Sequence, residues 1–285
     1  METIINDLQD TAFWESSWEQ ARRDSFLMNT QKISPERWHE FYDSIGDIYH
    51  HTWGEPWRLG EEAGRIFFSE GLIRPGSEVL DLGCGPGTLS IPLAEKGVRV
   101  TGMDYSENML TSLQKEAAHR GLENIRTVRA SFGEYQTDLR YDLVAAACFP
   151  PVLEPSGIKK IEEWSKGFCA VIFGSGEKDQ PIRKSLWSPI MKAAPPSGKF
   201  YLIHLMGWLL AGGRQPNLKH ISWTYRFSRP FEEVLRFYKN YFAIFGKDDA
   251  ETELLIRNIL EQYRTDEHIS SQGEAELWLV WWKKP

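Results

Sequence analysis

The sequence is poor in cysteine, and its three cysteines stand alone. Cys84, Cys148 and Cys169 show neither the paired spacing of a zinc site nor the even number of a disulfide framework. Such usage is typical of a reducing compartment, so we expect the protein in the cytoplasm. No spacing of His, Cys, Asp or Glu suggests ligands for an ion, and we expect no metal.

An excess of positive charge is also missing. Lys and Arg total 33 against 40 for Asp and Glu, which gives a formal net charge of −7. Proteins that bind duplex nucleic acid through its phosphates usually carry a basic stripe or a cationic balance. Neither is present in this sequence, so we expect no nucleic-acid partner.

Long apolar runs are missing as well. A membrane-spanning helix needs roughly 18 apolar residues. The longest candidate, Phe200–Ala211, has 12 residues and contains His204 and Gly207, which indicates a buried or interfacial segment. The first ten residues are acidic and lack the cationic start and apolar stretch of a secretory signal. We therefore expect no membrane partner.

The first 75 residues show the spacing of amphipathic helices. Ser34 followed by Pro35 is typical of a helix start. Five of the 12 tryptophans precede residue 58, so this segment is unusually aromatic. We predict a helical cap over residues 1–75, either packed as ordinary core or acting as an aromatic lid over a ligand. One helical face carries Trp38, Phe41, Tyr42, Ile45, Ile48 and Tyr49, and a second pattern carries Leu59, Ala63, Ile66 and Phe67.

From residue 76 the pattern changes to strands that alternate with helices. Such alternation predicts a parallel, doubly wound α/β sheet with right-handed crossovers. Sheets of this kind bind ligands beyond the carboxyl ends of their strands. We predict one domain overall, with a core over residues 76–285 and helices inserted at about 181–212 and 230–265. The expected strands are 78–82, 98–103, 124–129, 141–147, 168–173, 220–227 and 274–282.

A glycine-rich turn follows the first of these strands. Residues 79–88 read Val-Leu-Asp-Leu-Gly-Cys-Gly-Pro-Gly-Thr, which spaces Gly83, Gly85 and Gly87 as G-x-G-x-G. Glycine is needed where the backbone turns sharply and a ligand must approach without a Cβ in its way. The spacing matches neither the G-x-G-x-x-G of dinucleotide sites nor the phosphate loop that ends in Gly-Lys.

An acidic residue ends the second strand. Asp104 comes 23 residues after Asp81, where a carboxylate can accept hydrogen bonds from both hydroxyls of a ribose. A glycine turn, an acid at this strand end and no phosphate grip together predict a nucleoside ligand without a phosphate tail. Another nucleotide-binding Rossmann protein remains the alternative interpretation.

Residues 79–110 resemble the class I S-adenosylmethionine-dependent methyltransferases, through the Asp-Leu-Gly-Cys-Gly-Pro-Gly core and the Asp104-Tyr105-Ser106 segment. The resemblance is strong over roughly residues 76–151. It implies a seven-stranded sheet in the order 3-2-1-4-5-7-6, with strand 7 antiparallel, and S-adenosyl-L-methionine as the cofactor.

The resemblance also implies which residues hold the cofactor. Asp81 and the glycines would hold its methionine end and Asp104 its ribose, while Tyr105 and Ser106 would flank the adenine. Ser131 stands where the family commonly has an acid that reads the adenine amino group, and Phe132 offers apolar contact there. The implied set is Asp81, Gly83, Cys84, Gly85, Gly87, Asp104, Tyr105, Met109, Ser131, Phe132, Ala147, Cys148 and Phe149.

Methyl transfer from a sulfonium is an in-line displacement, so the protein must chiefly orient the nucleophile and exclude water. Aromatic rings suit a cationic cofactor, since ring faces attract cations. If the acceptor is a hydroxyl or a thiol, a base would help, and one of His50 and His51 is the candidate. Surface histidines are the alternative interpretation. The aromatic residues expected to line the substrate pocket are Trp38, Tyr42, Tyr49, Trp53 and Trp57.

Residues 149–152, Phe-Pro-Pro-Val, lack the polar first and aromatic last residue of the Asn-Pro-Pro-Tyr motif of amino-directed nucleic-acid methyltransferases. The resemblance thus implies methyl transfer to a small molecule. A non-catalytic protein that binds the same cofactor and a protein methyltransferase remain alternatives.

Overall fold

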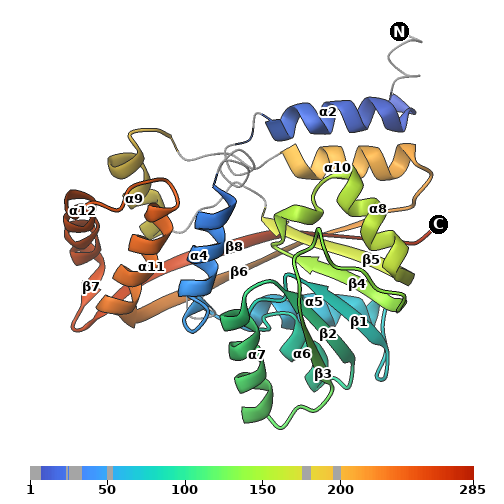
Figure 1. The fold of residues 1–285 in the computed structure, drawn as a ribbon, viewed down its shortest axis with the longest axis horizontal. Coiled ribbons are helices and arrows are strands. Elements are labelled where there is room, and N and C mark those ends of the chain that lie inside the picture. Colours follow the sequence, from blue (N-terminus) through green and yellow to red (C-terminus); the bar gives the residue numbers. More distant parts are fainter. Residues whose placement is uncertain (1–7, 24, 26–33, 50–53, 175–180, 195–199) are drawn as a thin grey trace.

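The computed structural model describes residues 8–23, 25, 34–49, 54–174, 181–194 and 200–285. Within these residues eight strands form one sheet, in the order β3-β2-β1-β4-β5-β8-β6, with the short β7 beside β8 (Figure 1). The strands are β1 Glu78–Leu82, β2 Arg99–Asp104, β3 Ile125–Arg129, β4 Tyr141–Ala147, β5 Ser165–Gly174, β6 Asn217–Pro230, β7 Arg264–Thr265 and β8 His268–Lys283.

The strand directions confirm the predicted topology. β1 to β5 pair in parallel. β8 runs antiparallel to β5 and to β6, so it takes the place of the antiparallel seventh strand. The two-residue strand β7 was not predicted, because so short a segment leaves no periodic signal.

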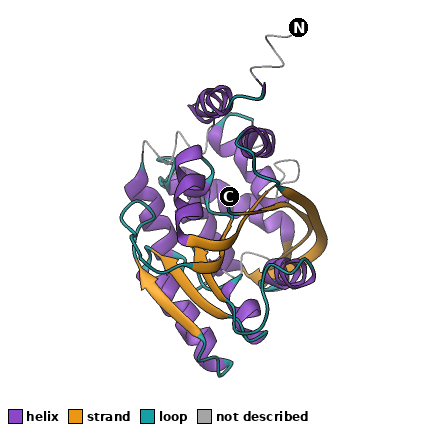
Figure 2. Ribbon diagram, turned by 90° about the vertical axis from the view of Figure 1, so that its right-hand side faces the viewer, coloured by secondary structure: helices purple, strands orange, loops and turns teal. Residues whose placement is uncertain are grey.

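Helices cover both faces of the sheet (Figure 2). Alternate residues of each strand point to opposite faces, so Leu80 and Val144 join one apolar cluster and Val79 and Leu143 join another. The first cluster includes residues of α8 Pro155–Trp164 and α10 Phe200–Ala211, and the second includes residues of α5 Arg58–Ser69 and α6 Ser90–Glu95. α7 Glu107–His119 packs through Leu110, Leu113 and Ala117 beside α6.

β6 and β8 are longer than the rest of the sheet. β8 pairs with β5 only through residues 277–283, whereas it pairs with β6 from residue 268 to residue 281. The unshared ends form a two-stranded extension that carries three helices, here called the outer helices: α9 Pro181–Met191, α11 Phe231–Ala243 and α12 Ala250–Leu260 (Figure 1). They share an apolar cluster of their own, which includes Leu186, Leu235 and Ile256.

Among the described residues, the helices that precede β1 are α2 Thr11–Arg23, α4 Pro35–Ser44 and α5. α2 packs along α10 (Figure 1). In α10, Leu205 and Trp208 are buried and Ile203 and Leu210 are exposed, as expected for an interfacial helix. None of the helices in the described parts of the chain has both the length and the hydropathy needed to cross a membrane.

α4 begins at Pro35 as predicted, but it is shorter than the apolar pattern suggests. The helix ends at Ser44, and Ser34 makes no side-chain capping bond. Ile45 and Ile48 are nevertheless buried in the same cluster as Trp38. A turn after the helix therefore continues the apolar face that the sequence pattern marks.

Candidate active site

The floor of the site is the turn after β1. β1 is buried, and Asp81 is only 1% exposed. Ser90, the first residue of α6, donates a hydrogen bond from Oγ to Oδ2 of Asp81 at 2.6 Å. Burial raises the pKa of Asp81 from 3.8 to about 7, although the Ser90 hydrogen bond opposes the shift. The charge of this carboxyl group therefore responds to a nearby cation at neutral pH.

The glycines of the turn serve different needs. Gly83, Gly85 and Gly87 all have positive φ, at 64°, 53° and 98°. A Cβ on Gly83 would lie 2.2 Å from the Phe149 ring, and one on Gly87 would lie 2.4 Å from a leucine of α7. A Cβ on Gly85 would meet only the sulfur of Met109, at 3.9 Å, among the described residues. Packing thus requires the first and third glycines, whereas the second leaves open space for a ligand.

Asp104 ends β2 beside this turn. It is 8% exposed, and both of its oxygens accept backbone N–H groups at 3.0 Å, Oδ2 from Gly85 and Oδ1 from Ser106. Ser106 in turn caps α7, because its Oγ accepts the N–H of Met109 at 3.2 Å. Burial raises the pKa of Asp104, and the backbone donors oppose that shift. Each carboxylate oxygen retains a lone pair for a ligand hydroxyl.

The end of β4 supplies another wall. Cys148 has a φ of 52°, a region that residues other than glycine rarely adopt, and its N–H donates to the carbonyl of Ile172 at 2.7 Å. Burial raises the pKa of its thiol to about 11, so the thiol is neutral at pH 7. Phe149 follows, and its ring covers the turn at Gly83.

Aromatic residues at α4 form the wall opposite the glycine turn. Trp38 and Tyr42 stack with ring centres 5.8 Å apart, and the ring of Tyr49 lies 6.0 Å from that of Tyr42. Burial raises the pKa of Tyr42, so its hydroxyl stays protonated at neutral pH.

Hydrogen bonds fix the end of α4 over the start of α7. Ser106 donates from Oγ to Asp43 at 2.8 Å, and Asn108 donates from its amide to the Asp43 carbonyl at 3.0 Å. Ser112 donates to the carbonyl of Gly46 at 2.8 Å. The residue that caps α7 beneath Asp104 therefore also anchors the aromatic wall.

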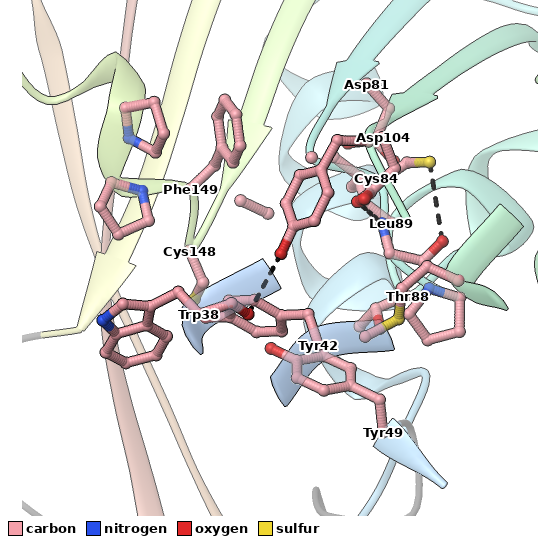
Figure 3. Close-up of a pocket in the computed structure, with 18 of the residues that line it drawn as sticks. Trp38, Tyr42, Tyr49, Asp81, Cys84, Thr88, Leu89, Asp104, Cys148 and Phe149 are labelled. Carbon is pink, nitrogen blue, oxygen red and sulfur yellow. Dashed lines mark hydrogen bonds between the residues drawn. The ribbon is translucent and has the colours of Figure 1, made fainter. Parts of the chain in front are cut away.

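These elements enclose a cavity of about 220 Å³ (Figure 3). Figure 3 shows Phe149, Cys148 and Trp38 on one side of the cavity and Asp81, Asp104 and Cys84 on the other. The acids and the aromatic wall thus line one cavity.

Comparison with known proteins agrees with this geometry. The profile of a family described as "Methyltransferase domain" matches residues 79–165. That segment runs from β1 to the start of β5 and contains the glycine turn, Asp104 and the end of β4. Residues 79–165 are therefore similar to a methyltransferase domain.

Curated relatives match parts of this chain that differ in length. A protein of Papaver bracteatum named "Probable (S)-tetrahydroprotoberberine N-methyltransferase 2" is 34% identical over 87 residues, which are 30% of this chain and 24% of that protein. A ribosomal protein L11 methyltransferase of Syntrophomonas wolfei is 29% identical over 205 residues, 68% of this chain and 62% of that protein. The matches span only 28% and 24% of the first two relatives found.

Among solved structures, the magnesium protoporphyrin IX methyltransferase of Synechocystis, crystallised with bound S-adenosylhomocysteine, superposes with a TM-score of 0.47. It is 16% identical, and the superposition covers 85% of this chain and 92% of that one.

Most of the residues predicted to hold the cofactor of the methyltransferase line the cavity. Those brought together are Asp81, Gly83, Cys84, Gly85, Asp104, Tyr105, Met109, Ala147, Cys148 and Phe149, with Trp38, Tyr42 and Tyr49 from the predicted substrate pocket.

Four predicted residues lie in described parts of the chain but outside the cavity lining. Gly87 packs against α7, and Ser131 donates its hydroxyl to Glu134 at 2.7 Å. Phe132 packs edge-on against Phe149, with ring centres 5.7 Å apart, and so supports the lining from behind. Trp57 lies under the guanidinium of Arg120, 4.6 Å from it. His50, His51 and Trp53 fall outside the described residues.

The lining also contains residues that the sequence analysis did not select. His39 packs on Tyr105 with ring centres 4.2 Å apart. Pro150 and Pro151 follow Phe149, and their place directly after a predicted strand end could have marked them. The full additional set is Pro35, His39, Leu59, Pro86, Thr88, Leu89, Pro150 and Pro151.

Proposed function

We propose that this protein is an S-adenosylmethionine-dependent methyltransferase that acts on a small molecule. One observation carries the proposal: the glycine turn, Asp104 and the aromatic wall from α4 line the same cavity. In this proposal residues 1–75 form a cap over a core at 76–285, with helices inserted at about 181–212 and 230–265.

The residues of the cavity fit the cofactor. The open space at Gly85 and the buried carboxyl group of Asp104 suit a ribose, and Asp81 suits the amino group of the methionine end. Tyr105 and Met109 would border the adenine. When bound, S-adenosylmethionine supplies an electrophilic methyl group on a sulfonium. Phe149 and Cys148 would exclude water from the transfer site.

A cavity lined largely by apolar and aromatic side chains favours a small acceptor over a macromolecule. Two of the relatives' names, a tetrahydroprotoberberine N-methyltransferase and a ubiquinone biosynthesis O-methyltransferase, refer to small molecules, whereas the L11 relative is named for a protein. The three cysteines are unpaired, in keeping with the proposed cytoplasmic location.

A base is proposed at His50 or His51. Tyr42 and Cys148 do not suit that role, since burial raises the pKa of both groups and leaves them protonated at neutral pH. Replacing each histidine with alanine should lower turnover of a hydroxyl or thiol acceptor in one variant and leave cofactor affinity unchanged. If both variants are as active as the unmodified protein, neither histidine is the base.

Calorimetric titration with S-adenosylmethionine and S-adenosylhomocysteine tests the proposal. Binding of both, followed by release of S-adenosylhomocysteine in the presence of small-molecule acceptors, is the expected result. Binding without turnover of small molecules, peptides or proteins would favour the non-catalytic alternative, and turnover confined to proteins would favour a protein methyltransferase. Absence of binding would overturn the proposal.

A further inference from the structure

The turn after β3, residues 130–135, connects two walls of the cavity. Ala130 donates its N–H to the carbonyl of Asp104 at 3.0 Å. Two residues later, Phe132 packs edge-on against Phe149, with ring centres 5.7 Å apart and an interplanar angle of 85°. Asp104 and Phe149 both line the cavity. The position of this turn therefore affects both of them.

A lysine of α8 holds the turn from outside the cavity. Nζ of Lys160 donates hydrogen bonds to the carbonyls of Phe132 at 2.5 Å and of Gly133 at 3.1 Å. The same ammonium lies 4.9 Å from the centre of the Phe132 ring and 5.1 Å from that of Trp164. Ring faces attract cations, and an ammonium carries three donors. Lys160 therefore fixes both the backbone and the ring of Phe132.

The ring of Phe132 passes this constraint on to the cavity wall. Trp164 packs edge-on against it, with ring centres 5.9 Å apart, so Phe132 is held between Trp164 and Phe149. The Phe149 ring in turn covers the glycine turn, since a Cβ on Gly83 would lie 2.2 Å from it. Lys160 does not line the cavity, so it reaches the site only through the turn after β3.

We propose that Lys160 is a positioning residue for the cofactor: it holds Phe132 in the place that keeps the Phe149 ring closed over the glycine turn. This inference rests on the proposed function, which assigns Phe149 to the methyl-transfer site. Without the ammonium, two carbonyls of the turn lose their donor and the Phe132 ring loses its cation. The support behind Phe149 is then free to shift.

Substitutions at Lys160 test the role of the ammonium. Lys160→Met keeps the length of the side chain and removes its charge and donors. Calorimetric titration should show that the dissociation constant of S-adenosylhomocysteine rises by about 3- to 10-fold, the size of a single net hydrogen bond. Lys160→Arg retains a cation with several N–H donors and should bind within about 2-fold of the unmodified protein.

The neighbouring lysine provides a matched control. Lys159 pairs with Glu15 of α2 at 2.7 Å and lies 5.8 Å from the Trp208 ring centre, so it points away from the turn after β3. Lys159→Met should leave the affinity for S-adenosylhomocysteine unchanged. Urea unfolding verifies that each variant is folded at the temperature of the titration. If Lys160→Met does not fold, Lys160→Gln takes its place.

A double-mutant cycle tests the path through Phe132. Phe132→Leu removes the ring on which Lys160 acts, so adding Lys160→Met should change the dissociation constant by less than about 2-fold. Two effects that simply multiply would show that the residues act independently and would overturn the inference. Unchanged affinity in Lys160→Met, or equal weakening by Lys159→Met or Lys160→Arg, would overturn it as well. Failure of the unmodified protein to bind S-adenosylhomocysteine would instead reject the proposed function itself.

Discussion

Two buried carboxyl groups lie at neighbouring strand ends, and their partners differ. Asp104 accepts two backbone N–H groups, which keep it in place and favour its charged form. The carboxyl group of Asp81 accepts the hydroxyl of Ser90. Asp104 is therefore held in one position as a hydrogen-bond acceptor. The charge of Asp81, in contrast, depends on the group that binds beside it.

Asp104→Ala should weaken binding of S-adenosylhomocysteine by about 1.5–3 kcal/mol, because hydrogen bonds to a charged carboxylate are lost. Calorimetric titration measures the change. Asp142 offers a control, since it accepts the N–H of Glu78 at 2.8 Å and does not line the cavity. Asp142→Ala should leave the dissociation constant unchanged, and an unchanged constant in Asp104→Ala would refute the assigned role.

The raised pKa of Asp81 makes binding dependent on pH. In the free protein this group is largely protonated below about 7, and the amino group of the ligand favours the charged carboxylate. Affinity for S-adenosylhomocysteine should therefore rise as pH increases from about 6 through 7, with release of a proton. Titrations in buffers of different ionisation enthalpy measure that proton. Asp81→Asn should remove both effects, and a pH-independent affinity in the unmodified protein would contradict the assignment.

Protonation of Asp81 also makes the stability of the free protein depend on pH. Stability should fall as pH rises, whereas ligand affinity should increase. Its pKa in the folded protein lies above the ordinary value of 3.8, so between pH 4 and 7 the folded state holds a proton that the unfolded state has lost. The contribution of this group to stability is therefore lost as pH rises through about 7. Urea unfolding of the free protein should show a smaller decrease in stability over this range for Asp81→Asn. An equal decrease in both proteins would assign the dependence to other groups.

At the scale of elements, the turn after β1 depends on contact with β4. Gly83→Ala would place a Cβ against Phe149 in a backbone region that disfavours side chains, and we expect a loss of about 2–5 kcal/mol. Gly121 has a similar φ of 66° but no atom within 4 Å of the added Cβ. Gly121→Ala should therefore lose only about 1–2 kcal/mol. Urea unfolding compares the two, and equal losses would show that the contact with Phe149 is unimportant.

The sequence predicts the elements around this turn well, because their signals are local. The glycine spacing and the acid at the end of β2 each depend on residues close in the chain. The roles of the glycines are not predictable in this way, since the Gly83 contact with Phe149 joins residues 66 apart.

The same limit explains why two residues predicted for the site, Trp57 and Ser131, do not line the cavity. Trp57 belongs to the aromatic segment that the sequence marks, yet the guanidinium of Arg120 covers it. Ser131 could accept a bond from adenine, but it donates to Glu134 in its own turn. Composition and spacing identify which residue types are available, and only tertiary packing decides which of them reach the cavity.

At the scale of the molecule, α4 connects the cofactor end of the sheet with the outer helices. Arg37 donates to the carbonyl of Ala243 at 2.9 Å, and Asp47, just after α4, pairs with Arg236 of α11 at 2.7 Å. Phe41 packs against Phe237 with ring centres 5.7 Å apart. The helix α4 is therefore attached to α7 on one side and to α11 on the other, and its aromatic residues line the cavity between them and the sheet.

Ligand binding should consequently change the dynamics of α4 more than those of the outer helices. Hydrogen bonds join Asp43 of α4 to Ser106 and Asn108 at the start of α7, beside Asp104. A ligand that stabilises this region should therefore slow the exchange of the α4 backbone amides with solvent when S-adenosylhomocysteine is saturating. Hydrogen–deuterium exchange measured by mass spectrometry resolves peptides from α4 and from α12, which packs against α9 and α11 and contributes no residue to the cavity lining. Exchange in α12 should stay the same and thereby serves as the internal control. Unchanged exchange in α4 at full occupancy would show that ligand binding beside Asp104 does not stabilise α4.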